Sequence, residues 1–175
     1  DININEYLWR IMNIFYLDKD PKLCAQYHND KHVVKMILEY AQLMCTAHRE
    51  LDIISKNSLM DNSLYKSTHK NHPSAKWVRE SAYNYYWLYQ LWSNLCNEYT
   101  YRYGKKHLTD TKLRKLLRHP PHHAPLNKPF TQPPQAMPDD VKEEDSIMAY
   151  RNYYKLYKEH LATWTDRPPP EWYSL

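Results

Sequence analysis

Glycine is almost absent from the sequence, which has 175 residues and a single glycine, Gly104. Phosphate-binding loops, dinucleotide-binding turns and the G-x-S-x-G nucleophile elbow all need glycine at fixed positions. A helix-hairpin-helix motif needs a glycine-bearing hairpin as well. The tight turns of hairpin-rich β folds also require residues with positive φ. The scarcity of glycine therefore excludes these sites and favours an all-α fold.

Cysteine pairs and long apolar runs are missing too. The cysteines Cys24, Cys45 and Cys96 form no C-x-x-C motif, so buried free thiols in a reducing compartment are expected. No stretch approaches the roughly 18 apolar residues of a membrane-spanning helix. Residues 1–11 lack the basic and apolar regions of a signal peptide. We therefore expect an intracellular protein with no membrane partner.

The overall composition is mildly basic and rich in Asn, Lys, Tyr and Ile, with 24 Lys and Arg against 20 Asp and Glu and a net charge of +4. This charge is far below that of a histone-like protein. A composition rich in these residues and poor in glycine is typical of AT-rich genomes, including those of many phages and large DNA viruses. The expected location is therefore the host cytoplasm or the virus particle.

Aromatic residues are abundant, with 17 Tyr and 6 Trp. They interleave with basic residues in two segments, 99–107 and 150–158. Tyr rings can stack on bases while Lys and Arg neutralise phosphates, and residues 110–119 add a short basic helix. This pattern predicts DNA as a partner. The alternative is that Tyr fills a helical core with its hydroxyl groups at the rim.

Apolar periodicity and capping residues predict a single-domain helical bundle over residues 1–175. Helices are expected at 21–27, 31–51, 74–103, 110–119 and 141–164. Asp20, the pair Asn29-Asp30 and Gly104 are the expected caps, and Asp139 and Asp140 are expected to cap the last helix.

The remaining segments are expected to be irregular. Residues 2–17 carry a helical series of apolar residues, although 13–17 could also form a short buried strand. Residues 52–70 read as a loop with one helical turn, and the proline-rich segment 120–138 must be extended. We expect the tail to pack back onto the domain through Trp172 and Tyr173.

The helix at 31–51 is apolar over most of its circumference, which predicts that it is largely buried. Val33, Val34, Ile37 and Leu38 contribute to the apolar side. One narrow polar stripe remains, which must contact solvent or line a pocket. Its members are His32, Lys35, Glu39, Gln42, Thr46 and Arg49.

The start of this helix carries the candidate catalytic residues. Lys35 or Lys31 could act as an amine nucleophile that forms a Schiff base, with Glu39 one turn away as acid, base or counter-ion. His32 is a candidate proton shuttle, and Asp30 lies beside it. The alternative is a capped helix in which Lys35 and Glu39 form an ordinary salt bridge worth ~0.3 kcal/mol.

A second cluster lies at Asn71-His72-Pro73, where another helix begins. Its free N–H groups could bind a phosphate, with Arg79 and His72 as the holding groups. Trp77 lies close by in the sequence, and Gln42 and Arg151 complete the candidate substrate-binding residues. The alternative is an ordinary helix cap followed by a solvent-facing Arg79.

Metal ligands are a weaker prediction. His28 and His32 have the i, i+4 spacing that suits a metal on a helix face, but a helix start between them would misalign the rings. His119, His122 and His123 lie in the proline-rich segment. We expect no bound metal and no cofactor, and a His-based metal-dependent hydrolase is kept as an alternative.

Three motifs give the chain a recognisable resemblance: M-N-I-F-Y-L-D-x-D-P from Met12, then C-A-Q-Y-H-x-D-K-H-V-V-K-M-I-L-E-x-A-Q, then N-H-P-S-x-K-W-V-R. Together they resemble a family of small phage and large-virus proteins over residues 12–172, for which DNA-repair glycosylase is one functional label. The resemblance implies that residues 1–11 precede the common start of relatives. The helical, glycine-poor build is also similar to that of viral pyrimidine-dimer glycosylases, although their N-terminal Thr nucleophile is not found here.

Two hypotheses follow from these patterns. The first is an enzyme that acts on DNA or a nucleotide base, either as a glycosylase/lyase or as a base-modifying enzyme. The second is a binding or virion-associated structural protein, since Tyr, Trp and a proline-rich arm suit interfaces.

Overall fold

The computed structural model describes residues 11–174 and shows an all-α bundle in one domain, as predicted. The α-helices are α2 (Pro21–Tyr27), α3 (Asp30–Leu51), α4 (Leu59–Ser63), α5 (Pro73–Glu80), α6 (Ala82–Tyr103), α7 (Leu108–Leu117) and α8 (Ser146–Tyr157). Short 3₁₀ turns occur at Asp139–Val141, Glu159–Leu161 and Glu171–Ser174. The described residues contain no strand, and none of their helices is long and apolar enough to cross a membrane.

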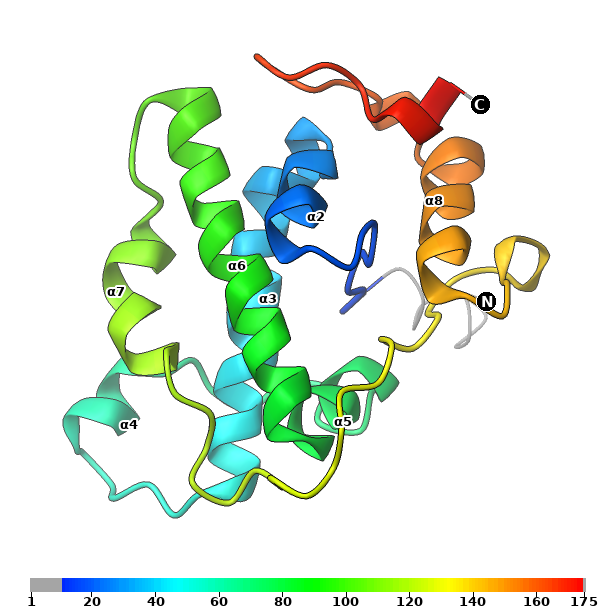
Figure 1. The fold of residues 1–175 in the computed structure, drawn as a ribbon. Helices are drawn as coiled ribbons and strands as arrows, with labels where there is room; N and C mark the ends of the chain where they lie inside the picture. Colours follow the sequence, from blue (N-terminus) through cyan, green and yellow to red (C-terminus); the bar gives the residue numbers. More distant parts are fainter. Residues whose placement is uncertain (1–10, 175) are drawn as a thin grey trace, which may run out of the picture.

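Helices α3 and α6 form the centre of the bundle. Each has 22 residues and is therefore about 33 Å long at ~1.5 Å per residue. They pack against each other, and the buried Trp92 of α6 donates a hydrogen bond from Nε1 to the carbonyl of Ile37 (2.9 Å). In Figure 1, α7 lies on one side of this pair and α8 on the other.

The predicted caps at three helix ends are confirmed. The Asp20 side chain accepts a hydrogen bond from the N–H of Lys22, and Asn29 accepts one from His32. Gly104 ends α6 with φ at 70°, a left-handed conformation that glycine adopts without a Cβ clash. The region 52–70 also contains one short helix, α4, as expected.

The helix predicted over 74–103 is wrong, because the structure breaks it at Ser81. This residue is extended, with φ −149° and ψ 139°. Its Oγ accepts the N–H of Tyr83 and donates to the carbonyl of Lys128 (2.7 Å), while the N–H of Ala82 donates to the carbonyl of Pro125. The proline-rich segment therefore satisfies groups that a continuous helix would have paired internally.

The two ends of the chain also differ from prediction. Residues 13–17 form neither helix nor strand but an irregular buried segment, in which the N–H of Leu17 donates to the carbonyl of Phe15. The rest of the predicted 2–17 helix lies mostly outside the described residues. The last helix begins at Ser146 with Asp145 as its cap and ends at Tyr157, so it is much shorter than the predicted 141–164. Asp139 and Asp140 begin a 3₁₀ turn instead.

Smaller differences concern α3 and α7. Val34 and Leu38 are exposed rather than buried, so the outer face of α3 is broader than the polar stripe. Helix α7 begins at Leu108, two positions before the predicted start at Asp110.

The C-terminal tail packs back onto the domain, as predicted. The Trp172 ring is buried and meets Tyr27 edge to face, with centroids 5.8 Å apart. Tyr173 packs against Trp164, with centroids 5.1 Å apart. The tail thus covers α2 and the end of α8.

Candidate functional site

The first turn of α3 contacts α8 through His32. The Nδ1 of His32 lies 2.7 Å from the hydroxyl oxygen of Tyr154, which also accepts the N–H of Asn29. The buried Tyr154 hydroxyl has no other acceptor among the described residues, so its proton points at Nδ1, which makes Nδ1 an acceptor and leaves the proton of the neutral ring on Nε2. Burial, followed by the charges of His28 and Lys158, holds the pKa of His32 well below its usual value.

A second buried pair, His28 and Tyr40, packs next to the start of α3. The Nδ1 of His28 donates to the carbonyl of Cys24 (2.7 Å), so its Nε2 accepts from the hydroxyl of Tyr40 (2.8 Å). The Tyr40 oxygen in turn accepts the N–H of Phe15 (3.1 Å). The Phe15 ring stacks on His32 with centroids 4.1 Å apart. Segment 13–17 is thus held against the start of α3.

Lys35 and Glu39 lie on the next turns of α3, and Lys158, which follows the last residue of α8, acts on the same region. Burial raises the pKa of Glu39, against the opposing charges of Lys35 and Lys158. The charges of Lys158 and Lys35 also act on His32. Glu39, His32 and two lysines therefore influence one another electrostatically, which is the combination that amine and acid–base chemistry require.

The predicted residues on either side of His32 have different environments. Lys31 is exposed. Asp30 accepts hydrogen bonds from the N–H and hydroxyl of Thr165 (both 2.8 Å) and pairs with Arg102 (3.1 Å). Although partial burial opposes ionisation, these bonds hold the pKa of Asp30 below its usual value. The Asp30 carboxylate is therefore committed to the tail and α6.

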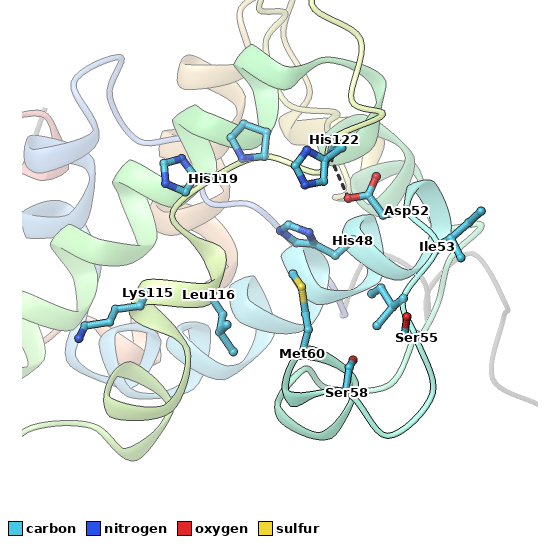
Figure 2. A pocket seen from close by; sticks show the side chains of 12 residues that line it. His48, Asp52, Ile53, Ser55, Ser58, Met60, Lys115, Leu116, His119 and His122 are labelled. Atoms are coloured by element: carbon cyan, nitrogen blue, oxygen red, sulfur yellow. Dashed lines mark hydrogen bonds between the residues drawn. The ribbon is translucent and has the colours of Figure 1, made fainter.

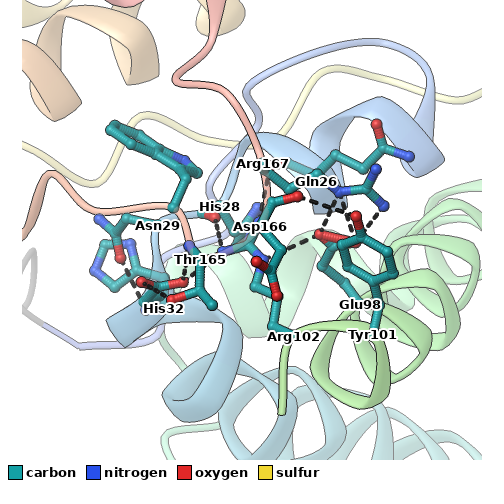
Figure 3. A network of polar contacts seen from close by, with 12 residues as sticks. Gln26, His28, Asn29, His32, Glu98, Tyr101, Arg102, Thr165, Asp166 and Arg167 are labelled. Carbon is teal, nitrogen blue, oxygen red and sulfur yellow. Dashed lines mark hydrogen bonds and ion pairs between the residues drawn. The ribbon is translucent and has the colours of Figure 1, made fainter. Parts of the chain in front are cut away.

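Figure 3 shows the wider network around Arg102. This buried guanidinium contacts the carbonyls of Gln26 and His28 and the carboxylates of Asp30 and Glu98. The guanidinium of Arg167, in the tail, lies 2.8 Å from the carboxylate of Glu98. The network joins the α2–α3 corner, the end of α6 and the tail.

The second predicted cluster reaches α3 farther along its axis. The loop before α5 meets α3 where the N–H of Thr68 donates to Thr46 Oγ1, and α5 packs on α3. Thr46 follows His32 by 46 − 32 = 14 residues, or about 21 Å along the helix. His72 caps α5 through Ser74 N–H, and the Arg79 guanidinium donates to the carbonyl of Lys70.

The structure also shows the surroundings of the remaining predicted substrate-binding residues. Trp77 is buried, and its Nε1 donates to the carbonyl and hydroxyl oxygens of Thr131. Arg151 donates to the carbonyl of Leu17 and to Asp18, and its guanidinium lies over the Trp172 ring. Asn71 is exposed, and Gln42 is half-buried on α3.

Sequence analysis missed the roles of Tyr154 on α8 and of Lys158, the residue directly after this helix. The interleaved segment 150–158 marked this helix as basic and aromatic, but only the packing shows that it faces the start of α3. The other interleaved segment, 99–107, lies at the end of α6, where Arg102 reaches Asp30 at the start of α3 and Tyr101 donates to the carbonyl of Asp166 in the tail.

Metal binding finds little support in the described residues. Both ring nitrogens of His28 are hydrogen-bonded within the protein. His123 pairs with Asp52 at 2.9 Å. The part of the chain between residues 11 and 174 contains no group of three or more His, Cys, Asp or Glu that could hold a metal ion.

Comparison with known proteins assigns the family. The family described as pyrimidine dimer DNA glycosylase matches residues 12–111, more than half of the chain. The chain belongs to this family. No match is found among curated proteins or among solved structures. The matched region of the pyrimidine dimer DNA glycosylase family includes segment 13–17, α2 and all of α3, which carry the His32 and Glu39 site.

Proposed function

We propose that the protein is a DNA glycosylase that excises damaged pyrimidines, and that the His32, Lys35, Glu39 and Lys158 cluster is its active site. Family membership carries the proposal, because the matched region contains the helix that bears three of these residues. The clustering of amines with a carboxyl group of raised pKa supports the location.

Lys35 is the proposed nucleophile. It is exposed, so substrate can reach its amine, and its charge reaches both Glu39 and His32. The amine nitrogen forms a bond to C1′ of the damaged nucleotide while the bond from C1′ to the base breaks, and the base leaves with the electron pair. Opening of the sugar ring between C1′ and O4′ then gives a Schiff base.

Glu39 is the proposed acid–base group. It accepts a proton from the attacking amine and returns one to O4′ when the sugar ring opens. Burial raises the pKa of Glu39, which favours a carboxyl group that both takes up and releases a proton. His32 is neutral and carries its proton on Nε2. Its proposed role is therefore to donate a hydrogen bond to the substrate rather than to shuttle protons, as the sequence had suggested.

Borohydride trapping on DNA that contains a pyrimidine dimer tests these roles. The wild-type protein is expected to form a covalent adduct that Lys35→Ala loses. Lys31→Ala is the matched control, because it removes an exposed lysine one turn away on the same helix. Glu39→Gln is expected to lower the excision rate by about 100-fold.

The Lys158→Ala variant tests which of the two neighbouring lysines, Lys35 or Lys158, is the nucleophile. If Lys35 is the nucleophile, this variant still forms the adduct and only the rate of excision falls. An adduct that survives in both Lys35→Ala and Lys158→Ala would contradict the assignment of the amine. Absence of excision on every damaged DNA tested would contradict the proposed function itself.

A further inference from the structure

A pocket of about 490 Å³ lies at the C-terminal end of α3. Figure 2 shows that its lining comes from the end of α3, the loop that follows, α4, α7 and the start of the proline-rich segment. His48 of this pocket follows His32 by 48 − 32 = 16 residues, or about 24 Å along the helix. The pocket is thus separate from the proposed active site.

The walls of the pocket are largely apolar. Ile54, Met60, Leu116 and Pro120 contribute to them. Ile53 lies at the mouth and is 97% exposed, so a bound molecule would remove this side chain from water. Binding pockets for small molecules have this character, with volumes of roughly 300 to 1,000 Å³ and a few polar groups on apolar walls.

The polar groups at the edge are mainly donors. Lys115, His119 and His122 are exposed there, and their side chains make no hydrogen bond or ion pair within residues 11–174. The carboxylate that lines the pocket, Asp52, is already occupied by the N–H groups of His122 and His123 (2.8 and 3.0 Å) and by the His123 ring (2.9 Å). The edge therefore retains an unpaired positive charge on Lys115.

His48 closes the inner side of the pocket as a rigid neutral ring. Its Nε2 lies 2.8 Å from the hydroxyl oxygen of Tyr85, whose proton goes to the carbonyl of Leu117 (2.7 Å). Nε2 must therefore donate its own proton to Tyr85. This hydrogen bond orients the imidazole, which is almost fully buried (3% exposed) and lies beside the Met60 thioether in the lining (Figure 2).

We infer that this pocket binds a small molecule that combines a flat ring with one anionic group. The apolar walls and the His48 ring would hold the ring, while Lys115 and the imidazole N–H groups of His119 and His122 would bind the anion. Aromatic carboxylates and mononucleotides share this chemistry and fit the volume. A bare metal ion does not, because no suitable group of ligands exists within residues 11–174.

Calorimetric titration of the full chain tests the inference with whole ligands and their halves. Benzoate is compared with toluene and acetate, and thymidine 5′-monophosphate with thymidine and inorganic phosphate. At least one whole ligand is expected to bind with Kd below about 1 mM, and its halves at least about tenfold more weakly, or ~1.4 kcal/mol. The better whole ligand identifies the class.

Two variants locate the binding. Lys115→Gln is expected to weaken binding of the whole ligand about tenfold. Lys112→Gln is the matched control on the same helix, because the Lys112 ammonium lies over the Tyr65 ring, 4.7 Å from its centroid, and should leave binding unchanged. Met60→Trp fills the pocket and should abolish binding, with circular dichroism as the check on folding.

The inference is overturned if no whole ligand binds more tightly than its halves, or if Lys115→Gln binds like the wild type. Because Lys115 is exposed, this variant remains informative even if Met60→Trp does not fold. Excision of damaged bases does not enter the readout, so the result is independent of the proposed function.

Discussion

Three of the four buried histidines are each paired with a tyrosine hydroxyl, while the fourth, His72, caps α5 through the N–H of Ser74. The pairs are His28 with Tyr40, His32 with Tyr154 and His48 with Tyr85, at 2.7 to 2.8 Å. A buried imidazole is costly to charge, and a tyrosine can satisfy it without adding a charge. This pairing explains part of the tyrosine content, since Tyr fills the core and supplies hydrogen bonds there.

The buried histidines predict that stability falls in acid. Burial lowers the pKa of His28 to about 3 and that of His48 to about 4, against ~6.5 in the unfolded chain. Below pH 6.5 the unfolded chain binds protons that the folded protein does not, so stability is fully present above pH 6.5 and is lost as pH falls. Each histidine contributes a slope of up to about 1.4 kcal/mol per pH unit.

Urea unfolding between pH 7 and pH 4 measures this slope. His28→Gln is expected to be less stable at pH 7 but to show a shallower dependence on pH than the wild type. The same slope in both proteins would contradict the assignment of a neutral buried His28.

The tautomer of His32 can be tested directly. The wild-type ring should carry its proton on Nε2, as ¹⁵N chemical shifts would report, because Tyr154 donates to Nδ1. Tyr154→Phe removes that donor and should increase the population of the Nδ1–H tautomer. Tyr153→Phe, on the neighbouring position of α8, is the control. A ring that is already Nδ1-protonated in the wild type would contradict the proposed donor role of Nε2.

At the scale of elements, helix boundaries depend on partners from distant segments. The sequence around Ser81 has no glycine or proline to stop a helix, yet α5 and α6 separate there. The carbonyls of Pro125 and Lys128 supply the competing hydrogen bonds. A segment 40 or more residues away thus sets the corner, which local periodicity could not indicate.

Removal of this corner contact should destabilise the protein. Ser81→Ala loses the cap of α6 and leaves the Lys128 carbonyl without its donor, so the free energy of unfolding should fall by about 1–2 kcal/mol. Ser93→Ala is the control on α6, because its hydroxyl bonds only within the helix, to Gln90 at 3.2 Å, and should change stability by less than about 0.5 kcal/mol. Equal effects in urea unfolding would contradict the role of Ser81.

At the scale of the whole molecule, Arg102 joins parts that are far apart in sequence. Its side chain is fully buried and pairs with Asp30 and Glu98, while Arg167 of the tail completes the charge balance on Glu98. The network therefore positions the start of α3, and with it the candidate site, relative to α6 and the tail.

Arg102→Gln should cost about 3–5 kcal/mol of stability, because it removes one partner from a buried ionic network. Lys142→Gln is the control: it breaks an i, i+3 pair with Asp139 in which both side chains are exposed, and about 1 kcal/mol is the most expected. Thermal or urea unfolding distinguishes them. A similar small loss in both variants would show that the Arg102 network does not stabilise the fold.

Much of the site could be predicted from α3 alone. The cap at Asn29 and the spacing of His32, Lys35 and Glu39 place these residues along one helix, because helix periodicity is local. Whether they act in catalysis stays a prediction. Lys158 could not be found in this way, since its place beside Glu39 depends on how α8 packs.

The sequence by itself determined the all-α class and the caps at Asp20, Asn29 and Gly104, because each depends on residues within a few positions of one another. Only the tertiary structure decided the break at Ser81, the commitment of Asp30 to the tail, and the separation of His72 and Arg79 from His32. These features depend on hydrogen bonds and packing between segments that the chain brings together only when it folds.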